Sequence, residues 1–125
     1  MIVFIGALFG FFSVAFGAYA EHGLKKQISE DVFYSVLKAL RFNQVYAILL
    51  VVLGLVIVNA DKFTGISAGL LRYSAYAFIL GIVLFCFSIY GSAVFSYPSL
   101  TKVAPFGGTM FMVGWLILAW AGIRA

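Results

Sequence analysis

The sequence is poor in charge, cysteine and histidine. Only 10% of its 125 residues are charged, and it contains one cysteine, Cys86, and one histidine, His22. A soluble domain carries about 25% charged residues, so this shortage excludes a water-soluble globule. A single cysteine excludes an internal disulfide framework and a multi-cysteine metal centre. The net charge of +4 comes from basic residues that are scattered over the ends of apolar runs, so the sequence predicts no nucleic-acid partner.

Apolar residues fill most of the chain, since 65% of the residues are hydrophobic. A helix needs about 20 predominantly apolar residues to cross a bilayer. Four runs of this kind lie at roughly 1–20, 42–59, 70–95 and 105–123. The first run lacks the positively charged residues that begin a signal peptide, which favours a span. The sequence therefore predicts an all-α fold in which residues 1–125 form a single transmembrane domain, an integral membrane four-helix bundle with an amphipathic segment between spans one and two.

The amphipathic segment precedes the second apolar run. Ser29 can cap a helix, and Glu30 and Asp31 place negative charge in its first turn, where the helix dipole favours it. The next residues form an apolar face of Phe33, Val36, Leu37 and Leu40 and a polar face of Asp31, Tyr34, Lys38 and Arg41. Such a segment either lies at the membrane surface as a separate helix or continues into the span as one long helix. The sequence leaves both open.

Small residues recur at helical spacing along the predicted spans. Gly6, Gly10, Ser13 and Gly17 are separated by intervals of four, three and four, which places them on one face of a helix. Small residues on one face let two helices approach closely in a membrane. Pro105 is expected to open the fourth helix, because proline fits the first turn. The predicted helix-packing residues are Gly6, Gly10, Ser13, Gly17, Gly81, Pro105, Gly107, Gly108 and Gly114.

The sequence offers little chemistry for catalysis or ion-coupled transport. Ionisable residues inside a membrane are usually functional, but none lies at the centre of a predicted span. The sequence contains no phosphate-binding loop and no Cys/His metal-ligand spacing. His22 is the only histidine available as a base for a serine nucleophile or as an axial ligand for haem, and it lies at the end of a span. We therefore expect no enzyme, no cofactor and no metal site.

Polar side chains near the start of the second span form the candidate site. Asn43, Gln44 and Tyr46 stand within about one helical turn of each other, among apolar neighbours. Amides in hydrocarbon need partners, and Ser88, Tyr90 or the backbone at the head of the fourth helix can supply them. The cluster is either structural glue between helices or the lining of a small cavity that binds a lipid headgroup or other amphiphile. Its candidate members are His22, Asn43, Gln44, Tyr46, Ser88 and Tyr90.

Four segments resemble the signatures of one family of small membrane proteins. The segments are GAYAEHGLK from Gly17, FNQVYA from Phe42, GIVLFCFSIY from Gly81 and APFGG from Ala104. In this order they are similar to the domain of unknown function 423 family, the YgdD-like proteins. The resemblance implies a four-span protein of the bacterial plasma membrane or a related organelle membrane. Where the family has a histidine in the second span this chain has Tyr46, which argues against a mechanism that needs two histidines.

Two functional hypotheses follow from these features. The first is a non-enzymatic structural or accessory membrane protein, whose small-residue faces pack its own bundle and a partner or a second copy. The alternative is a small-molecule or lipid binder, or a passive transporter, with a polar cavity between helices. The expected partners are membrane lipids and a second copy of the chain or a larger membrane complex.

Basic residues favour one orientation of the chain in the plasma or inner membrane. Short cytoplasmic loops accumulate Lys and Arg. Lys25, Lys26, Lys38, Arg41 and Lys102 belong to one side of the predicted bundle, and Lys62, Arg72 and Arg124 belong to the other. The sequence therefore predicts a multi-pass protein with both termini outside the cytoplasm.

Overall fold

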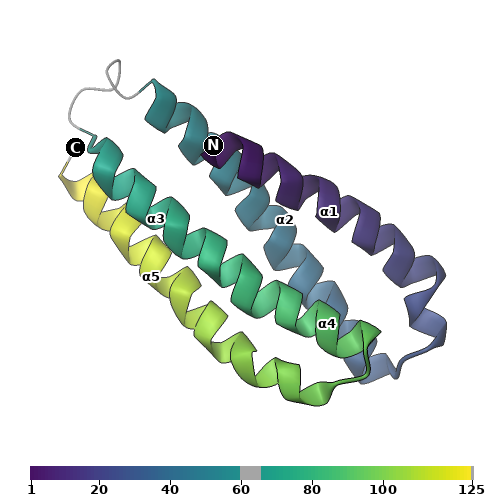
Figure 1. Ribbon diagram of the computed structural model, residues 1–125. Helices are drawn as coiled ribbons and strands as arrows, with labels where there is room; N and C mark the ends of the chain where they lie inside the picture. Colours follow the sequence, from purple (N-terminus) through teal and green to yellow (C-terminus); the bar gives the residue numbers. More distant parts are fainter. Residues whose placement is uncertain (60–65, 125) are drawn as a thin grey trace.

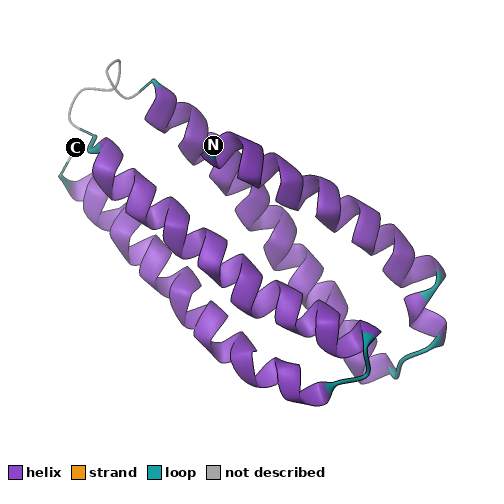
Figure 2. Ribbon diagram, viewed as in Figure 1, coloured by secondary structure: helices purple, strands orange, loops and turns teal. Residues whose placement is uncertain are grey.

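A computed structural model describes residues 1–59 and 66–124 of the chain. These residues form helices and short connections, with no β-strand among them (Figure 2). Four helical segments are long and apolar enough to cross a membrane, which confirms the predicted all-α, four-span fold (Figure 1). In chain order the helices are α1 (Ile2–His22), the short η1 (Leu24–Lys26), α2 (Glu30–Val58), α3 (Ala68–Gly81), η3 (Ile82–Phe87), α4 (Ser88–Val94), η4 (Pro98–Val103) and α5 (Ala104–Ile123).

The four spans are arranged as two helix pairs. α1 packs mainly on α2, and α5 packs mainly on α3 and η3. α2 also contacts α3, η3 and α4, and so joins the two pairs. The labelled N and C termini lie at one end of the bundle, and the turns that follow α1 and α4 lie at the opposite end (Figure 1). We call this opposite end, which carries residues 21–31 and 95–103, the charged end; Lys62 lies outside the described residues.

The second span is a single long helix, which decides between the two alternatives for the amphipathic segment. α2 begins at Glu30, well before residue 42, and runs without a break to Val58. The Ser29 hydroxyl oxygen accepts a hydrogen bond from the Val32 backbone N–H at 3.3 Å, so Ser29 caps the helix as predicted. Between Glu30 and Gly54 the sequence has neither glycine nor proline, so nothing in it ends the helix.

The third span contains a wider turn that the sequence did not predict. Residues Ile82–Phe87 form a π-helix, η3, between α3 and α4. A β-carbon added to Gly107 of α5 would clash with the backbone of Phe85, so α5 crosses directly against this π-helical turn. The Ser88 hydroxyl donates to the Phe85 carbonyl at 2.8 Å, which satisfies one backbone acceptor at the end of η3. A π-helical turn changes which of the following residues share a face of the helix. The spacing of apolar residues, which assumes a regular α-helix, therefore does not predict where such a turn lies.

Glycines stand where the spans cross most closely. A β-carbon on Gly6 would lie 2.9 Å from the Leu50 β-carbon, and one on Gly114 would lie 2.6 Å from the Phe78 ring. Gly81 is equally tight against Phe111. Gly54, which the sequence analysis did not single out, meets Val3 in the same way. Helices approach this closely only where no side chain intervenes.

Other predicted packing residues lie in looser surroundings. A β-carbon on Gly10 or Gly17 would have its nearest neighbour at 3.8 Å, which is ordinary contact. Gly108 differs from the prediction, because a β-carbon there would meet nothing within 4 Å. Gly108 is half-buried, and the space beside its α-carbon is open. Pro105 is exposed and lies in the first turn of α5, so it starts the helix rather than packing it.

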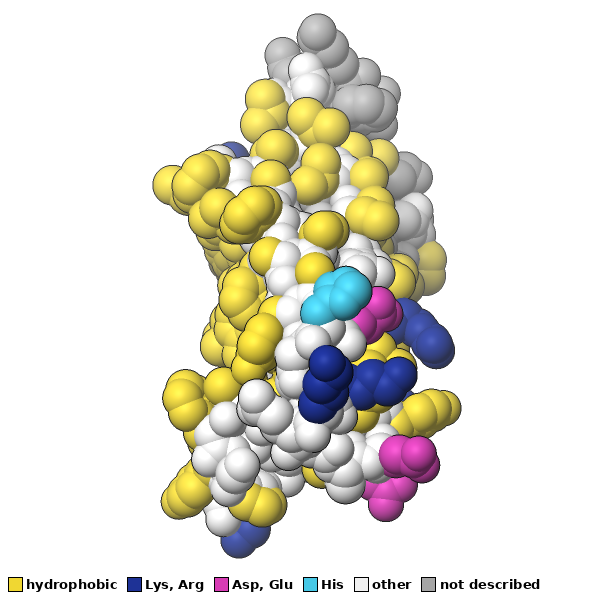
Figure 3. Space-filling model, turned by 90° about the vertical axis from the view of Figure 1, so that its right-hand side faces the viewer, with side chains coloured by type: hydrophobic (Ala, Val, Ile, Leu, Met, Phe, Trp, Pro, Cys, Tyr) yellow, Lys and Arg dark blue, Asp and Glu magenta, His cyan; other side chains and the backbone are white. Residues whose placement is uncertain are grey.

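Apolar side chains cover the outside of the bundle. Phe11, Ile48 and Leu116 are each at least 67% exposed, although they lie in the middle part of their spans. Most of the charged side chains visible in Figure 3 gather in the lower half of that face, below an apolar upper part. An apolar outer surface of this extent requires hydrocarbon as solvent. The protein is an integral membrane four-helix bundle.

Candidate functional site

A buried hydrogen bond joins the two helix pairs through Asn43. This residue is wholly buried on α2, and its Nδ2 donates to the Tyr90 hydroxyl oxygen on α4 at 3.0 Å. The Asn43 Oδ1 has no partner among the described residues. Tyr90 is also buried, and its ring lies against Phe16 of α1 with centroids 4.4 Å apart. Asn43 therefore helps to connect three spans through one polar contact and the ring it orients.

A second polar contact lies on the next inward turn of α2. The Tyr46 hydroxyl oxygen accepts a hydrogen bond from the Trp115 ring N–H of α5 at 2.7 Å. The Tyr46 ring stacks on Phe111, with centroids 4.0 Å apart and an interplanar angle of 8°, and on Phe78 at 5.1 Å. Sequence reasoning missed Trp115. The available signal was an indole N–H in an apolar helix, since that donor needs an acceptor where no water is present.

Hydroxyl and thiol groups bond to the backbone. The Ser74 hydroxyl of α3 donates to the Gly114 carbonyl at 3.0 Å, and the Cys86 thiol of η3 donates to the Ala39 carbonyl at 3.3 Å. Ser88 bonds within its own span and does not reach the amide of Asn43. The Ser74 bond connects α3 to α5 and the Cys86 bond connects η3 to α2, so both stabilise the packing of helices.

His22 and Gln44 lie apart from the buried pairs. His22 is exposed at the end of α1 and forms no hydrogen bond with the other cluster members in the described part of the chain. Gln44, next to the buried Asn43, is exposed and turns away from the core. Of the six predicted cluster residues, the structure therefore joins Asn43 directly to Tyr90, leaves Ser88 bonded to its own helix, and pairs Tyr46 with an unpredicted partner.

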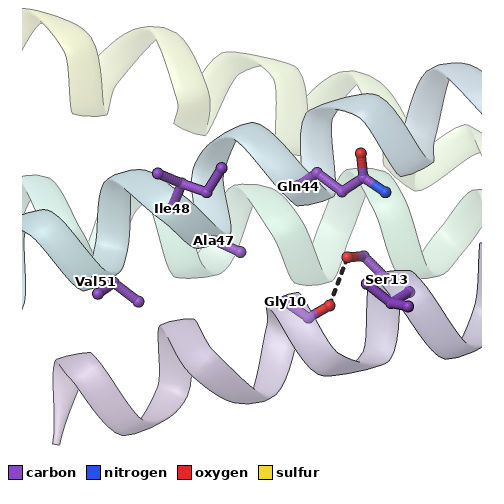
Figure 4. Close-up of a pocket in the computed structure, with 7 residues that line it drawn as sticks. Gly10, Ser13, Gln44, Ala47, Ile48 and Val51 are labelled. Atoms are coloured by element: carbon purple, nitrogen blue, oxygen red, sulfur yellow. Dashed lines mark hydrogen bonds between the residues drawn. The ribbon is translucent and has the colours of Figure 1, made fainter.

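Gln44 instead lines an open groove between α1 and α2. Gly10 and Ser13 contribute to one wall, and Ala47, Ile48 and Val51 to the other (Figure 4). This apolar part of the groove has a volume of about 290 Å³. Toward the charged end the hollow continues past Gln44 to Arg41 and Glu21, with a volume of about 470 Å³. The polar and apolar parts share Ser13, Val14 and Gln44, so they form one continuous groove.

Over residues 1–59 and 66–124, no three His, Cys, Asp or Glu side chains come together as a metal-binding group. The groove carries one carboxylate and one guanidinium, at Glu21 and Arg41, beside one amide. Such groups bind charged or hydrogen-bonding parts of a ligand.

Comparison with known proteins decides the family. The family described as protein of unknown function (DUF423) matches residues 16–108. The chain belongs to this family. A UPF0382 membrane protein of Haemophilus influenzae is 30% identical to it over 119 residues, covering 95% of this chain and 90% of the relative. A UPF0382 membrane protein of Staphylococcus epidermidis is 27% identical, covering 99% and 96% of the two chains.

Similarity to UPF0382 membrane proteins extends to a further bacterium. The UPF0382 membrane protein YwdK of Bacillus subtilis is 27% identical over 124 residues, covering 99% of this chain and 97% of the relative. No solved structure gave a significant match. The DUF423 match spans α2, α3, η3 and α4, together with the last turns of α1 and the first turn of α5. It therefore includes the Asn43–Tyr90 contact and the charged part of the α1–α2 groove.

Proposed function

We propose that this DUF423 protein is a non-enzymatic structural or accessory component of the cell membrane, acting through its outer surface. The observation that carries the proposal is the use of polar groups inside the bundle. Asn43 bonds Tyr90, Tyr46 bonds Trp115, and the remaining interior donors bond backbone carbonyls. Donors that are paired in this way hold helices together.

The close-packing faces support the same role. A neighbouring span of the same chain already fills the space beside four of the predicted packing glycines, namely Gly6, Gly81, Gly107 and Gly114. A partner helix or a second copy would therefore meet the apolar outer surface. Exposed residues such as Phe11 and Leu116 give that surface its character. Contact there is driven by packing between helices and by displacement of lipid.

The alternative of a polar inter-helix cavity loses most of its basis. It required the amides and hydroxyls of the cluster to face a common space, whereas Asn43 and Tyr46 are enclosed and paired. Gln44 is the member that favours a binding role, because it is exposed in the groove between α1 and α2. Binding of an amphiphile at this outer groove remains a second candidate function.

Crosslinking in native membranes tests the accessory role. Lys25, Lys26 and Lys38 are exposed near the charged end, so an amine-reactive crosslinker reaches them in the intact protein. A discrete species at the mass of a dimer or of a complex with one partner is expected. The control is the same membranes dissolved in sodium dodecyl sulfate before crosslinking, which should yield monomer. Recovery of monomer alone from intact membranes contradicts the proposal.

The proposal includes an orientation with both termini outside the cytoplasm. It rests on the excess of basic residues on the side of the charged end, opposite the termini, namely Lys25, Lys26, Lys38, Arg41 and Lys102. An alkaline phosphatase fused after residue 125 should then be active, and green fluorescent protein fused there should be dark. If the green fluorescent protein fusion is fluorescent and the phosphatase fusion is inactive, the C-terminus lies in the cytoplasm, which contradicts the proposed orientation.

A further inference from the structure

The groove between α1 and α2 has a defined order of chemical groups along its length. Gly17 faces Leu40 and Gly10 faces Ala47, which fixes how the two antiparallel helices align. At about 1.5 Å per residue, Arg41 then lies about 8 Å inward from Glu21, and Gln44, level with Ser13, lies about 12 Å inward. Beyond Gln44 the groove is lined by Gly10, Ala47, Ile48 and Val51. From the charged end inward, the backbone positions follow the order Glu21, Arg41, Gln44 and then apolar residues.

The Gln44 amide is open to the outside of the bundle, although its neighbours in this part of the groove are apolar. Gln44 is exposed beside Ile48, which is 67% exposed. Its amide forms no hydrogen bond with the residues drawn in Figure 4, where the Ser13 hydroxyl is already donating to the Gly10 carbonyl at 2.7 Å. Within the described residues, Glu21 and Arg41 form no ion pair with each other. A polar group left without a partner in hydrocarbon costs several kcal/mol, so this position calls for a polar ligand.

We propose that the groove binds one membrane phospholipid with a phosphoethanolamine headgroup. In this arrangement the Glu21 carboxylate accepts hydrogen bonds from the lipid ammonium, and the Arg41 guanidinium donates to the phosphate. The Gln44 amide donates to an ester carbonyl of the glycerol backbone. One acyl chain lies along the apolar part of the groove. The order of groups in such a lipid, from water inward, is ammonium, phosphate, ester and hydrocarbon, and the residues that would bind them follow the same order along the two helices.

Charge complementarity favours this headgroup over other occupants. A lipid whose headgroup is purely anionic meets Arg41 but is repelled by Glu21. A choline headgroup has no N–H to donate to a carboxylate and is recognised by aromatic faces, and the residues that line the charged part of the groove include no aromatic ring. A helix from a second copy would cover Glu21 and Arg41 with apolar side chains, which leaves two charges without solvent or ligand.

This inference goes beyond the proposed accessory role and is tested independently of it. Native mass spectrometry of the detergent-extracted protein counts bound lipids on the monomer, whether or not a partner exists. The probes are phosphatidylethanolamine, phosphatidylcholine and phosphatidylglycerol with identical acyl chains, each added at the same concentration. The ethanolamine lipid should be retained at least threefold more than either of the others. Equal retention of the three, a preference for the glycerol lipid, or a second copy that displaces lipid overturns the proposal.

Matched substitutions locate the binding to the groove. Glu21→Gln should abolish the preference for ethanolamine over glycerol lipid, whereas Glu30→Gln, outside the groove, should preserve it. Arg41→Gln should lower retention of all three lipids by about tenfold, the loss of one charge-assisted hydrogen bond of about 1.4 kcal/mol. Lys38→Gln is its control. Each variant must elute as a monodisperse helical protein. Gln44→Leu is a further groove variant, and it keeps both Glu21 and Arg41. If Glu21→Gln and Glu30→Gln behave alike, the site is not in this groove.

Discussion

The two helix pairs of this DUF423 protein use small residues in different ways. Between α5 and the third span, three glycines of the two helices, Gly81, Gly107 and Gly114, each leave no room for a β-carbon. Between α1 and α2 the contact is tight at Gly6 and Gly54, but it opens at Gly10 and Gly17, where the groove lies. The pair of α5 and the third span is therefore closely packed at all three of these glycines, and the α1–α2 pair is closely packed only at the two glycines near the termini.

The same contrast appears in two adjacent residues of α2. Asn43 and Gln44 carry the same functional group, but Asn43 is wholly buried and bonded to Tyr90, and Gln44 is exposed in the groove. Adjacent residues on a helix point about 100° apart, so one turns toward α4 and the other toward the open side of α1. Polar residues in a span thus divide into those that join helices and those that face a ligand or lipid.

Substitution at two neighbouring glycines of α5 should give the largest difference. Gly107→Ala forces a methyl group into the backbone of Phe85 and should lower the free energy of unfolding by about 1–3 kcal/mol. Gly108→Ala meets nothing within 4 Å and should leave it unchanged or raise it by up to about 1 kcal/mol through helix propensity. Unfolding in mixed micelles, followed by circular dichroism, measures both. Equal effects contradict the sealed contact.

A parallel pair of substitutions compares the closed and open parts of the α1–α2 contact. Gly6→Ala places a methyl 2.9 Å from the Leu50 β-carbon and should destabilise the bundle by about 1–2 kcal/mol. Gly17→Ala has its nearest neighbour at 3.8 Å and should change stability by less than about 0.5 kcal/mol. The same unfolding titration applies. A loss at Gly17 as large as that at Gly6 shows that the groove closes in solution.

The buried polar contact should contribute less than these steric effects. Tyr90→Phe removes the hydrogen bond and leaves the whole Asn43 amide unpaired, which should cost about 1 kcal/mol of stability. Combining it with Asn43→Leu should recover at least part of that loss, because neither partner is then left unsatisfied. Gln44→Leu, on the open side, is the control and should stay within about 0.5 kcal/mol of the parent. Additive losses in the double variant argue against the pair.

The hydrogen bond from Trp115 should show the smallest effect. Trp115 is 46% exposed, so Trp115→Phe should cost about 0.6 kcal/mol, the average of polar contacts in membranes. Tyr46→Phe should cost a similar amount, and the two together no more than either alone. Trp120→Phe, at an exposed tryptophan, should leave the unfolding free energy unchanged. Thermal unfolding in detergent resolves the order, and fully additive losses contradict a shared bond.

Much of this fold follows from composition and spacing. Four apolar runs predicted the four spans, and the capping Ser29 predicted the start of α2. Small-residue spacing pointed to the close approaches at Gly6, Gly81, Gly107 and Gly114. These features can be read from the sequence, because the length of an apolar run is matched to the thickness of a bilayer and because small residues at helical spacing mark a packing face.

The rest depends on how helices rotate against one another. In a membrane both the inner and the outer face of a span are apolar, so hydropathy does not decide whether Gln44 or Asn43 turns inward. The π-helix at Ile82–Phe87 shifts the faces of the third span, and no breaker residue marks it. Gly107 and Gly108 point about 100° apart on α5, and only a β-carbon on Gly107 would meet a neighbouring helix.

The most direct test of the contrast between sealed interior and open groove compares the side-chain amides of Asn43 and Gln44 in one unmodified sample. In a ¹⁵N-edited NOESY spectrum of the protein in lipid nanodiscs, the Gln44 amide protons should show cross-peaks to lipid protons. The Asn43 amide protons should show cross-peaks to the Tyr90 ring and none to lipid. Lipid cross-peaks at Asn43, or their absence at Gln44, would contradict the account.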